Sequence, residues 1–200
     1  MRKLSKEAID LDGAMKLLFN IQESKLMIPV LNFLFDTKLS TEIDAEIDFL
    51  DTSLIIRPSE PKLYADKYIH VCQADLDYYF HVEFQLADDT AMATRMFEYG
   101  YYFARKLIES YHTVYFLFPH QAVIYFENEP SVTDAHFFSY PSMDSKYHNY
   151  SYKIERLWAW DKEQLFKEKL FMLYPLIVFS YRKKIDEERG KNGDSEMLDK

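Results

Sequence analysis

Residues 64–85 read YADKYIHVCQADLDYYFHVEFQ, two apolar, strand-like segments separated by a short polar break. The break is typical of a two-residue hairpin turn at Ala74 and Asp75. Side chains alternate along each strand, so counting back from this turn places Asp66 directly opposite Glu83. The sequence therefore predicts a β-hairpin in which two carboxylates meet on one face of a sheet.

Two opposed carboxylates need a cation between them. Directly opposed residues have Cβ atoms about 4.5–5.5 Å apart, and like charges at that distance destabilise the pair. Mg²⁺ is the simplest hard cation for this place, because one or two carboxylates suffice when waters and substrate phosphates complete its octahedron. Such an ion polarises a phosphoryl oxygen and lowers the pKa of a bound water. Asp66 and Glu83 therefore predict phosphodiester hydrolysis.

Further polar side chains of the second strand share the face of Glu83, because the side-chain period of a strand is two. They are Tyr79, His81 and Gln85. Asp66, Glu83 and Gln85 then form an oxygen-rich cluster. His70 and His81 are candidate ligands, but a histidine in an aromatic-rich strand more often hydrogen-bonds a neighbour, and we interpret both in that way.

Composition narrows the class of protein. A chain of 200 residues with 48% hydrophobic content suits one globular domain. Four glycines form no phosphate-binding motif, and a single cysteine excludes a disulfide framework or a cysteine-rich zinc site. The net charge of -9 argues against a basic protein that coats nucleic acid. The sequence shows no secretory signal and no apolar run long enough for a membrane span, so we expect a soluble, cytoplasmic protein.

The remaining patterns predict helices around the hairpin and further strands. Helices are predicted over 12–36 (one helix, or two broken near Pro29), 91–111, 162–171 and 176–188, and strands over 45–56, 122–126, 136–139 and 150–158. This order predicts an α/β domain with helices on a mixed sheet. We expect a core over 1–160, a helical extension packed on it over 161–188, and a polar, flexible tail over 189–200.

The chain resembles the PD-(D/E)xK nuclease family transposases, relatives of bacterial recombination-promoting nucleases. The resemblance is carried by the segments DGAMKLLF (12–19), AD (65–66), HVEFQ (81–85) and MATRMFEY (92–99), and it covers most of the chain. It implies a restriction-endonuclease-like fold, a mixed sheet flanked by helices, that cleaves DNA with Mg²⁺, for which Mn²⁺ can substitute. The protein would then be an endonuclease that serves recombination or mobile elements. A cut in both strands would need a homodimer or repeated nicking.

The resemblance also implies roles for individual residues. Asp66 and Glu83 would hold the metal ion, with Asp12 as a third carboxylate. Arg95 and Tyr99 resemble an Arg-x-x-x-Tyr element that meets a phosphate. Gln85 stands where the wider superfamily has lysine, although glutamine is common among these relatives. A lysine offers a positive charge to the reacting groups, whereas glutamine offers only an amide dipole.

Each residue also has a structural interpretation. Asp66 could pair with Lys67 or Arg95 instead of a metal ion, and Asp12 could be a helix N-cap. The acidic residues at 42, 44, 46, 48 and 51 are typical of an exposed strand edge. Two other functions stay open: a catalytically inactive nuclease fold that binds DNA or protein, and a metal-dependent hydrolase of smaller phosphate esters.

Overall fold

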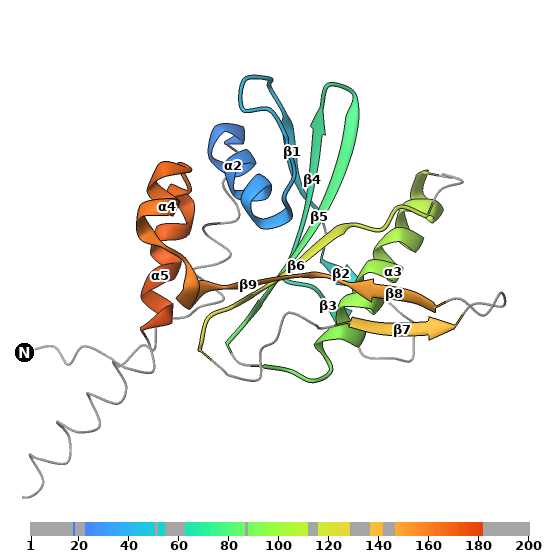
Figure 1. Cartoon of the computed structure of the whole chain (residues 1–200). Coiled ribbons are helices and arrows are strands. Elements are labelled where there is room, and N and C mark those ends of the chain that lie inside the picture. The colour runs from blue at the N-terminus through green and yellow to red at the C-terminus, as the bar shows by residue number, and fades with distance from the viewer. Residues whose placement is uncertain are drawn as a thin grey trace, which may run out of the picture.

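The computed structural model describes residue 18 and residues 23–50, 52–54, 63–86, 88–111, 116–128, 137–141 and 147–181. A sheet runs through the centre of this part (Figure 1). Three helices lie on one side of it, α2 (Ser24–Phe35), α4 (Lys162–Lys167) and α5 (Tyr174–Ser180), and α3 (Met92–Tyr111) lies on the other. The prediction of an α/β protein with a mixed sheet and several helices is confirmed.

The central sheet has five strands in the order β1-β4-β5-β6-β9. Their bounds are β1 (Glu46–Leu50), β4 (Lys67–Gln73), β5 (Leu76–Gln85), β6 (His120–Tyr125) and β9 (Lys153–Arg156). Strands β1, β4 and β5 pair antiparallel, whereas β5, β6 and β9 pair parallel. Two small antiparallel sheets accompany it: β2 (Ser53–Leu54) with β3 (Leu63–Tyr64), and β7 (Phe137–Pro141) with β8 (Tyr147–Ser151). Short 3₁₀ helices follow β9 and α4, η1 (Leu157–Ala159) and η2 (Phe171–Leu173).

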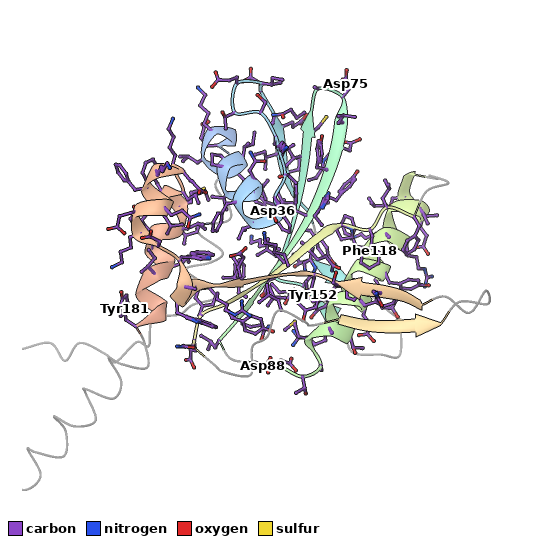
Figure 2. All side chains as sticks on the ribbon, in the orientation of Figure 1. Asp36, Asp75, Asp88, Phe118, Tyr152 and Tyr181 are labelled. Atoms are coloured by element: carbon purple, nitrogen blue, oxygen red, sulfur yellow. The ribbon has the colours of Figure 1, made fainter. Side chains whose placement is uncertain are left out.

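Strands β4 and β5 form the predicted hairpin. Ala74 and Asp75 are its two turn residues, with φ of 51° and 62°, the left-handed conformation of a type I′ turn. Asp75 lies at the tip of the hairpin, and Asp88, before α3, lies at the opposite end of the molecule (Figure 2). Gln73 pairs with Leu76, and the register continues without a bulge to the pair formed by Lys67 and Val82. The predicted register is therefore confirmed.

The sheet separates two apolar cores because alternate side chains point to opposite faces. Phe80 and Val82 of β5 face α2 and the carboxy-terminal helices, in a core that holds these buried residues: Met27, Leu31, Leu34, Ile69, Val71, Ile124, Leu165, Leu173 and Leu176. The opposite core, under α3, holds Tyr68, Met92, Met96, Tyr99, Phe103, Val123 and Tyr125. His81 and Glu83 lie on this second face. The polar face of β5 is thus covered by a helix.

Helix α3 begins at the predicted start signal. The Asp89 carboxylate accepts a hydrogen bond from the backbone N–H of Ala91 at 2.9 Å, and the Asp89 carbonyl accepts one from Met92 at 2.9 Å. An acidic residue at this end also complements the positive end of the helix dipole. Met92, Met96, Tyr99 and Phe103, spaced three or four apart, are buried against the sheet.

Two predicted boundaries are wrong. Helix α2 begins at Ser24, with the extended Glu23 as its N-cap, and continues through Pro29, so both a single helix over 12–36 and a break near Pro29 are incorrect. The strand predicted over 150–158 is divided at Tyr152 into β8 and β9, because the chain passes from the small sheet beside β7 to the central sheet beside β6. Burial of Met27, Val30 and Leu31 keeps α2 helical, although Pro29 has no backbone N–H to donate.

Other segments are shorter than predicted or lie outside the described residues. The strand predicted over 45–56 is represented by β1 and β2, and the helix predicted over 162–171 ends at Lys167. The predicted tail and residues 182–188 are outside the described part, as is Asp12. Glu42, Asp44 and Glu46 are exposed, as the reading of a solvated strand edge predicts. In the part of the chain that the structure describes, every helix is too short or too polar to cross a membrane.

Candidate functional site

The segments that carry Asp66 and Glu83 are joined by two hydrogen bonds, each from a backbone N–H of one segment to the carboxylate of the other. The backbone N–H of Asp66 donates to Glu83 Oε1 at 2.8 Å, and the backbone N–H of Phe84 donates to Asp66 Oδ2 at 2.8 Å. Each carboxylate therefore binds the backbone of the opposite strand. The sequence predicted this meeting, and its basis is the register that continues from the two-residue turn.

Glu83 is the buried member of the pair, with 1% of its surface exposed, whereas Asp66 is half-buried. A buried carboxylate is costly unless donors surround it. Glu83 Oε1 lies 2.9 Å from His81 Nε2, in addition to the Asp66 N–H. Oε1 is thus held by one backbone N–H and lies against an imidazole nitrogen.

Arg95 reaches the same place from α3. Its Nη2 lies 3.8 Å from Glu83 Oε2, an ion-pair distance beyond hydrogen bonding. Its Nη1 donates to Asp89 Oδ2 at 2.7 Å, and its Nη2 donates to the Tyr99 hydroxyl at 3.3 Å. Asp89 therefore caps α3 and orients the guanidinium, which keeps a third of its side chain exposed beside Glu83.

The charges of this group shift the pKa values of its members. Burial, and next the negative charge of Glu83, raise the pKa of Tyr99. Burial acts to lower the pKa of Arg95, but the hydrogen bonds to Tyr99 and Asp89 outweigh it and raise that pKa. Tyr99 is therefore a neutral hydrogen-bond partner and Arg95 a fixed positive charge at neutral pH.

Gln85 and Lys67, two further residues considered for this site, lie on β5 and β4. Gln85 is the last residue of β5, half-buried, and its carbonyl accepts a hydrogen bond from Phe126 N–H at 2.9 Å. Lys67 lies 5.3 Å from the centre of the Phe49 ring, on the apolar side of the sheet away from Glu83. Arg95, one of the two cations considered as partners for the acid pair, lies 3.8 Å from Glu83 Oε2.

Both histidines hydrogen-bond a neighbour, as predicted. His70 lies 2.6 Å from Asp77 Oδ1 and 3.8 Å from Asp48 Oδ2, at the solvent-facing end of the hairpin. His81 is fully buried and contacts Glu83. Only His81 belongs to the group around the acid pair.

Two residues near this group were missed by the sequence analysis. Gln121, 7% exposed on β6, has its Nε2 2.9 Å from His81 Nδ1. Tyr150 donates its hydroxyl hydrogen to Gln121 Oε1 at 2.5 Å. A glutamine directly before the apolar run 122–126 was the available signal for the first, because a buried amide needs several partners. No local pattern marks Tyr150.

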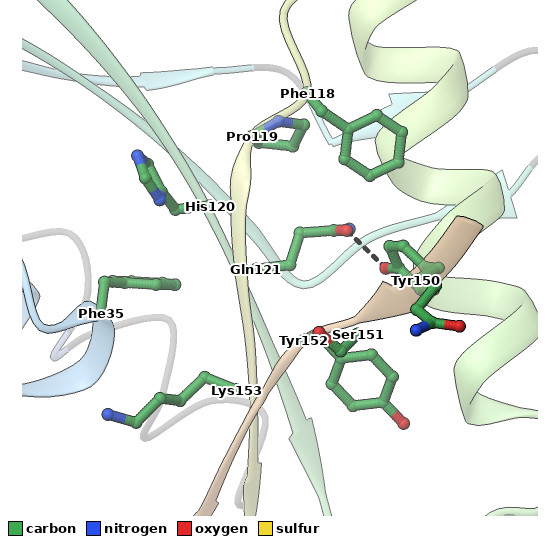
Figure 3. A pocket seen from close by; sticks show the side chains of 10 residues that line it. Phe35, Phe118, Pro119, His120, Gln121, Tyr150, Ser151, Tyr152 and Lys153 are labelled. Carbon is green, nitrogen blue, oxygen red and sulfur yellow. Dashed lines mark hydrogen bonds between the residues drawn. The ribbon is translucent and has the colours of Figure 1, made fainter. Parts of the chain in front are cut away.

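Gln121 and Tyr150 also line a cavity of about 500 Å³ (Figure 3). It is lined by Phe35, Phe118, Pro119, His120, Gln121, Asn149, Tyr150, Ser151, Tyr152 and Lys153. Neither Asp66 nor Glu83 lines it. The acid pair and the cavity are therefore separate features, connected through the Gln121 amide and His81.

The donor set can be compared with the needs of a metal ion. Among the described residues, no three His, Cys, Asp or Glu side chains are grouped closely enough to share one ion. Mg²⁺ commonly uses one or two carboxylates, with waters and phosphate oxygens as its other ligands. Asp66 and Glu83 fit that smaller set, whereas a zinc site built from side chains alone does not fit them.

Comparisons of the chain with protein-family models, with curated proteins and with solved structures found no match.

Proposed function

We propose that the protein is a Mg²⁺-dependent endonuclease that hydrolyses phosphodiester bonds in DNA, on a restriction-endonuclease-like fold related to the PD-(D/E)xK transposases. The observation that carries the proposal is that Asp66 and Glu83 each accept a backbone N–H from the other's segment, beside an arginine with a third of its side chain exposed. Arg95 already donates to Asp89 at 2.7 Å, so one guanidinium serves three acids there. An excess of acids suits a metal ion.

Asp66 and Glu83 would hold the ion, with Mn²⁺ as a substitute for Mg²⁺. When bound, such an ion supplies a Lewis acid for the phosphoryl oxygen and an activated water. Gln85, on the same face of β5 as Glu83, would orient the water or a phosphate oxygen through its amide. Arg95 would stabilise the negative charge of the transition state, and the neutral Tyr99 hydroxyl would contact a phosphate oxygen.

The protein's charge limits how it meets DNA. With a net charge of -9, affinity for DNA would come from a few local contacts and the metal ion, not from a broad basic surface. Cleavage of both strands would need two copies or successive nicks. We connect the activity with recombination or mobile elements on the resemblance in sequence alone.

Nicking of supercoiled plasmid in Mg²⁺ or Mn²⁺ tests the proposal. Glu83→Gln and Asp66→Asn should each lower the nicking rate by about 100-fold or more, because the metal contributes several kcal/mol to transition-state stabilisation. Glu155→Gln is the control, since Glu155, like Asp66, is a half-buried carboxylate that accepts a hydrogen bond, but it lies on β9. Equal rates in wild type and Glu83→Gln would remove Glu83 from the reaction.

One observation favours the alternative of an inactive nuclease fold that binds DNA or protein. Arg95 lies 3.8 Å from Glu83 Oε2, where it already neutralises part of the carboxylate charge. Calorimetric titration of the wild-type protein with Mn²⁺, together with the nicking assay, distinguishes an endonuclease from an inactive binding module. If the protein shows neither metal binding nor nicking, the remaining function is that of a binding module. Cleavage of a small phosphate ester in preference to plasmid would instead indicate a hydrolase of smaller substrates.

A further inference from the structure

A chain of buried hydrogen bonds extends from Glu83 through the second core. It runs from the Glu83 carboxylate to the His81 imidazole, then to the Gln121 amide, and ends at the Tyr150 hydroxyl. Glu83, His81 and Gln121 are 1%, 0% and 7% exposed. Burying three polar groups is costly unless each one is satisfied. The pattern of donors and acceptors along this chain can be deduced from its geometry.

The orientation of the Gln121 amide is determined by its neighbours. Its Nε2 lies 2.7 Å from the Met96 carbonyl oxygen, a contact that only an N–H group can make favourably. Its Oε1 lies 2.5 Å from the Tyr150 hydroxyl, which donates to it. The reversed amide would place two oxygens against each other at Met96. Nε2 therefore has one hydrogen for Met96 and one for His81.

The amide in turn selects the tautomer of His81. Gln121 Nε2 lies 2.9 Å from His81 Nδ1, and because it donates, Nδ1 must be the acceptor. In a neutral imidazole the other nitrogen then carries the hydrogen. That nitrogen, Nε2, lies 2.9 Å from Glu83 Oε1 and donates to it.

Aromatic contacts fix the plane of the ring. His81 stacks on Tyr68 with centroids 4.5 Å apart and meets the edge of Tyr99 at 5.3 Å. The Tyr68 hydroxyl donates to the Tyr99 carbonyl at 3.0 Å, which ties these two rings together. The imidazole therefore cannot turn away from Glu83 without disturbing the core under α3.

We propose that Gln121 and His81 are positioning residues that aim the Glu83 carboxylate. Oε1 is held by the His81 Nε2–H and the Asp66 N–H, and this leaves Oε2 facing the side where Arg95 lies at 3.8 Å. As a role in catalysis, this rests on the proposed function, in which Glu83 would hold the ion. The hydrogen-bond pattern itself does not depend on it. Partners of this kind outside the ligand shell typically change metal affinity or activity about 10–100-fold.

The tautomer is tested by long-range ¹H–¹⁵N correlation spectra of the full chain. His81 should show a protonated Nε2 and an unprotonated Nδ1. Gln121→Met, which keeps the volume and removes the amide, should shift the Nδ1 resonance because that nitrogen loses its donor, while the Glu83 carboxylate keeps Nε2 protonated. Gln73→Met is the matched control, because Gln73 is also a 7% exposed glutamine with three hydrogen bonds, to Ser40 and Ile43. A protonated Nδ1 in the wild type, or an Nδ1 resonance that is the same in Gln121→Met as in the wild type, would overturn the proposal.

The positioning role is tested by titration with Mn²⁺ alone. His81→Phe keeps the ring contacts and removes the donor, so its affinity for Mn²⁺ should fall by about 10–100-fold, and Gln121→Met should lose about 10-fold. Gln73→Met should bind as the wild type does. Wild-type affinity in both site variants would refute the role. A wild-type protein that binds no Mn²⁺ would instead refute the proposed function, while the spectra would still decide the hydrogen-bond pattern.

Discussion

At the scale of single residues, burial affects the carboxylate of Glu155 on β9. Its partners are Trp160 Nε1 at 3.0 Å and Lys153 Nζ at 3.7 Å. For Glu155 burial outweighs these partners and raises its pKa. Its ionised form is therefore penalised in the folded protein.

This predicts a pH-dependent effect of Glu155→Gln on stability. A raised folded-state pKa of an acid destabilises the fold at pH values above it, and the penalty disappears as the pH falls toward the unfolded value of about 4.3. At pH 8 the melting temperature of the variant should be higher than that of wild type, by a few degrees at most. Near pH 4 the two melting temperatures should be equal. Thermal melts over this range measure the difference. A variant less stable at pH 8 would mean that Lys153 and Trp160 outweigh burial.

At the scale of elements, the hairpin was predictable and its surroundings were not. A two-residue turn and a period of two determine every pair from Gln73 to Lys67, so local sequence suffices to bring Glu83 close to Asp66 at the end of the ladder. The buried hydrogen bonds of Gln121 join β6, β5 and α3, far apart in the sequence, and no local periodicity encodes them. The same holds for the division at Tyr152, which depends on which strands pair.

Helix α3 contains a close approach that also arises from distant residues. The Phe118 ring lies over Gly100, where a Cβ would be 2.1 Å from Cε1 and 2.2 Å from Cζ. The ring also packs against Phe97 at 5.8 Å and Tyr150 at 5.9 Å. Gly100, the one glycine in the described part of the chain, thus lets an aromatic side chain contact the helix backbone.

We therefore expect Gly100→Ala to destabilise the protein even though alanine favours a helix. Overpacking costs about 1–3 kcal/mol, whereas the gain in helix propensity is about 1 kcal/mol. Denaturant unfolding should show a net loss of about 1 kcal/mol. Phe118→Ala in the same chain should remove the clash, so the two changes should be non-additive in a double-mutant cycle. A more stable Gly100→Ala protein would show that the ring moves without cost.

At the scale of the whole molecule, the two faces of the sheet differ in the side chains that they bury. The face toward α2, α4 and α5 is a continuous apolar core that includes Leu165, Leu173 and Leu176 from the carboxy-terminal helices. The face toward α3 combines aromatic rings with the buried hydrogen bonds around Glu83. Both faces therefore bury apolar side chains, and the face toward α3 also holds polar groups in a fixed arrangement.

The charge of the whole chain predicts how DNA binding responds to salt. Each phosphate contact lowers the slope of log Kobs against log[salt] by about 0.9, and a protein of net charge -9 with local contacts should show a shallow slope. If Arg95 contacts a phosphate, Arg95→Met should make the slope less negative by about 0.9. Arg105→Met is the control on the same helix, because Arg105 is exposed and paired with Glu109 at 2.7 Å. Binding isotherms in Ca²⁺ at several salt concentrations measure both variants. Equal slopes for Arg95→Met and wild type would mean that Arg95 serves Glu83 and Asp89 within the fold and meets no phosphate.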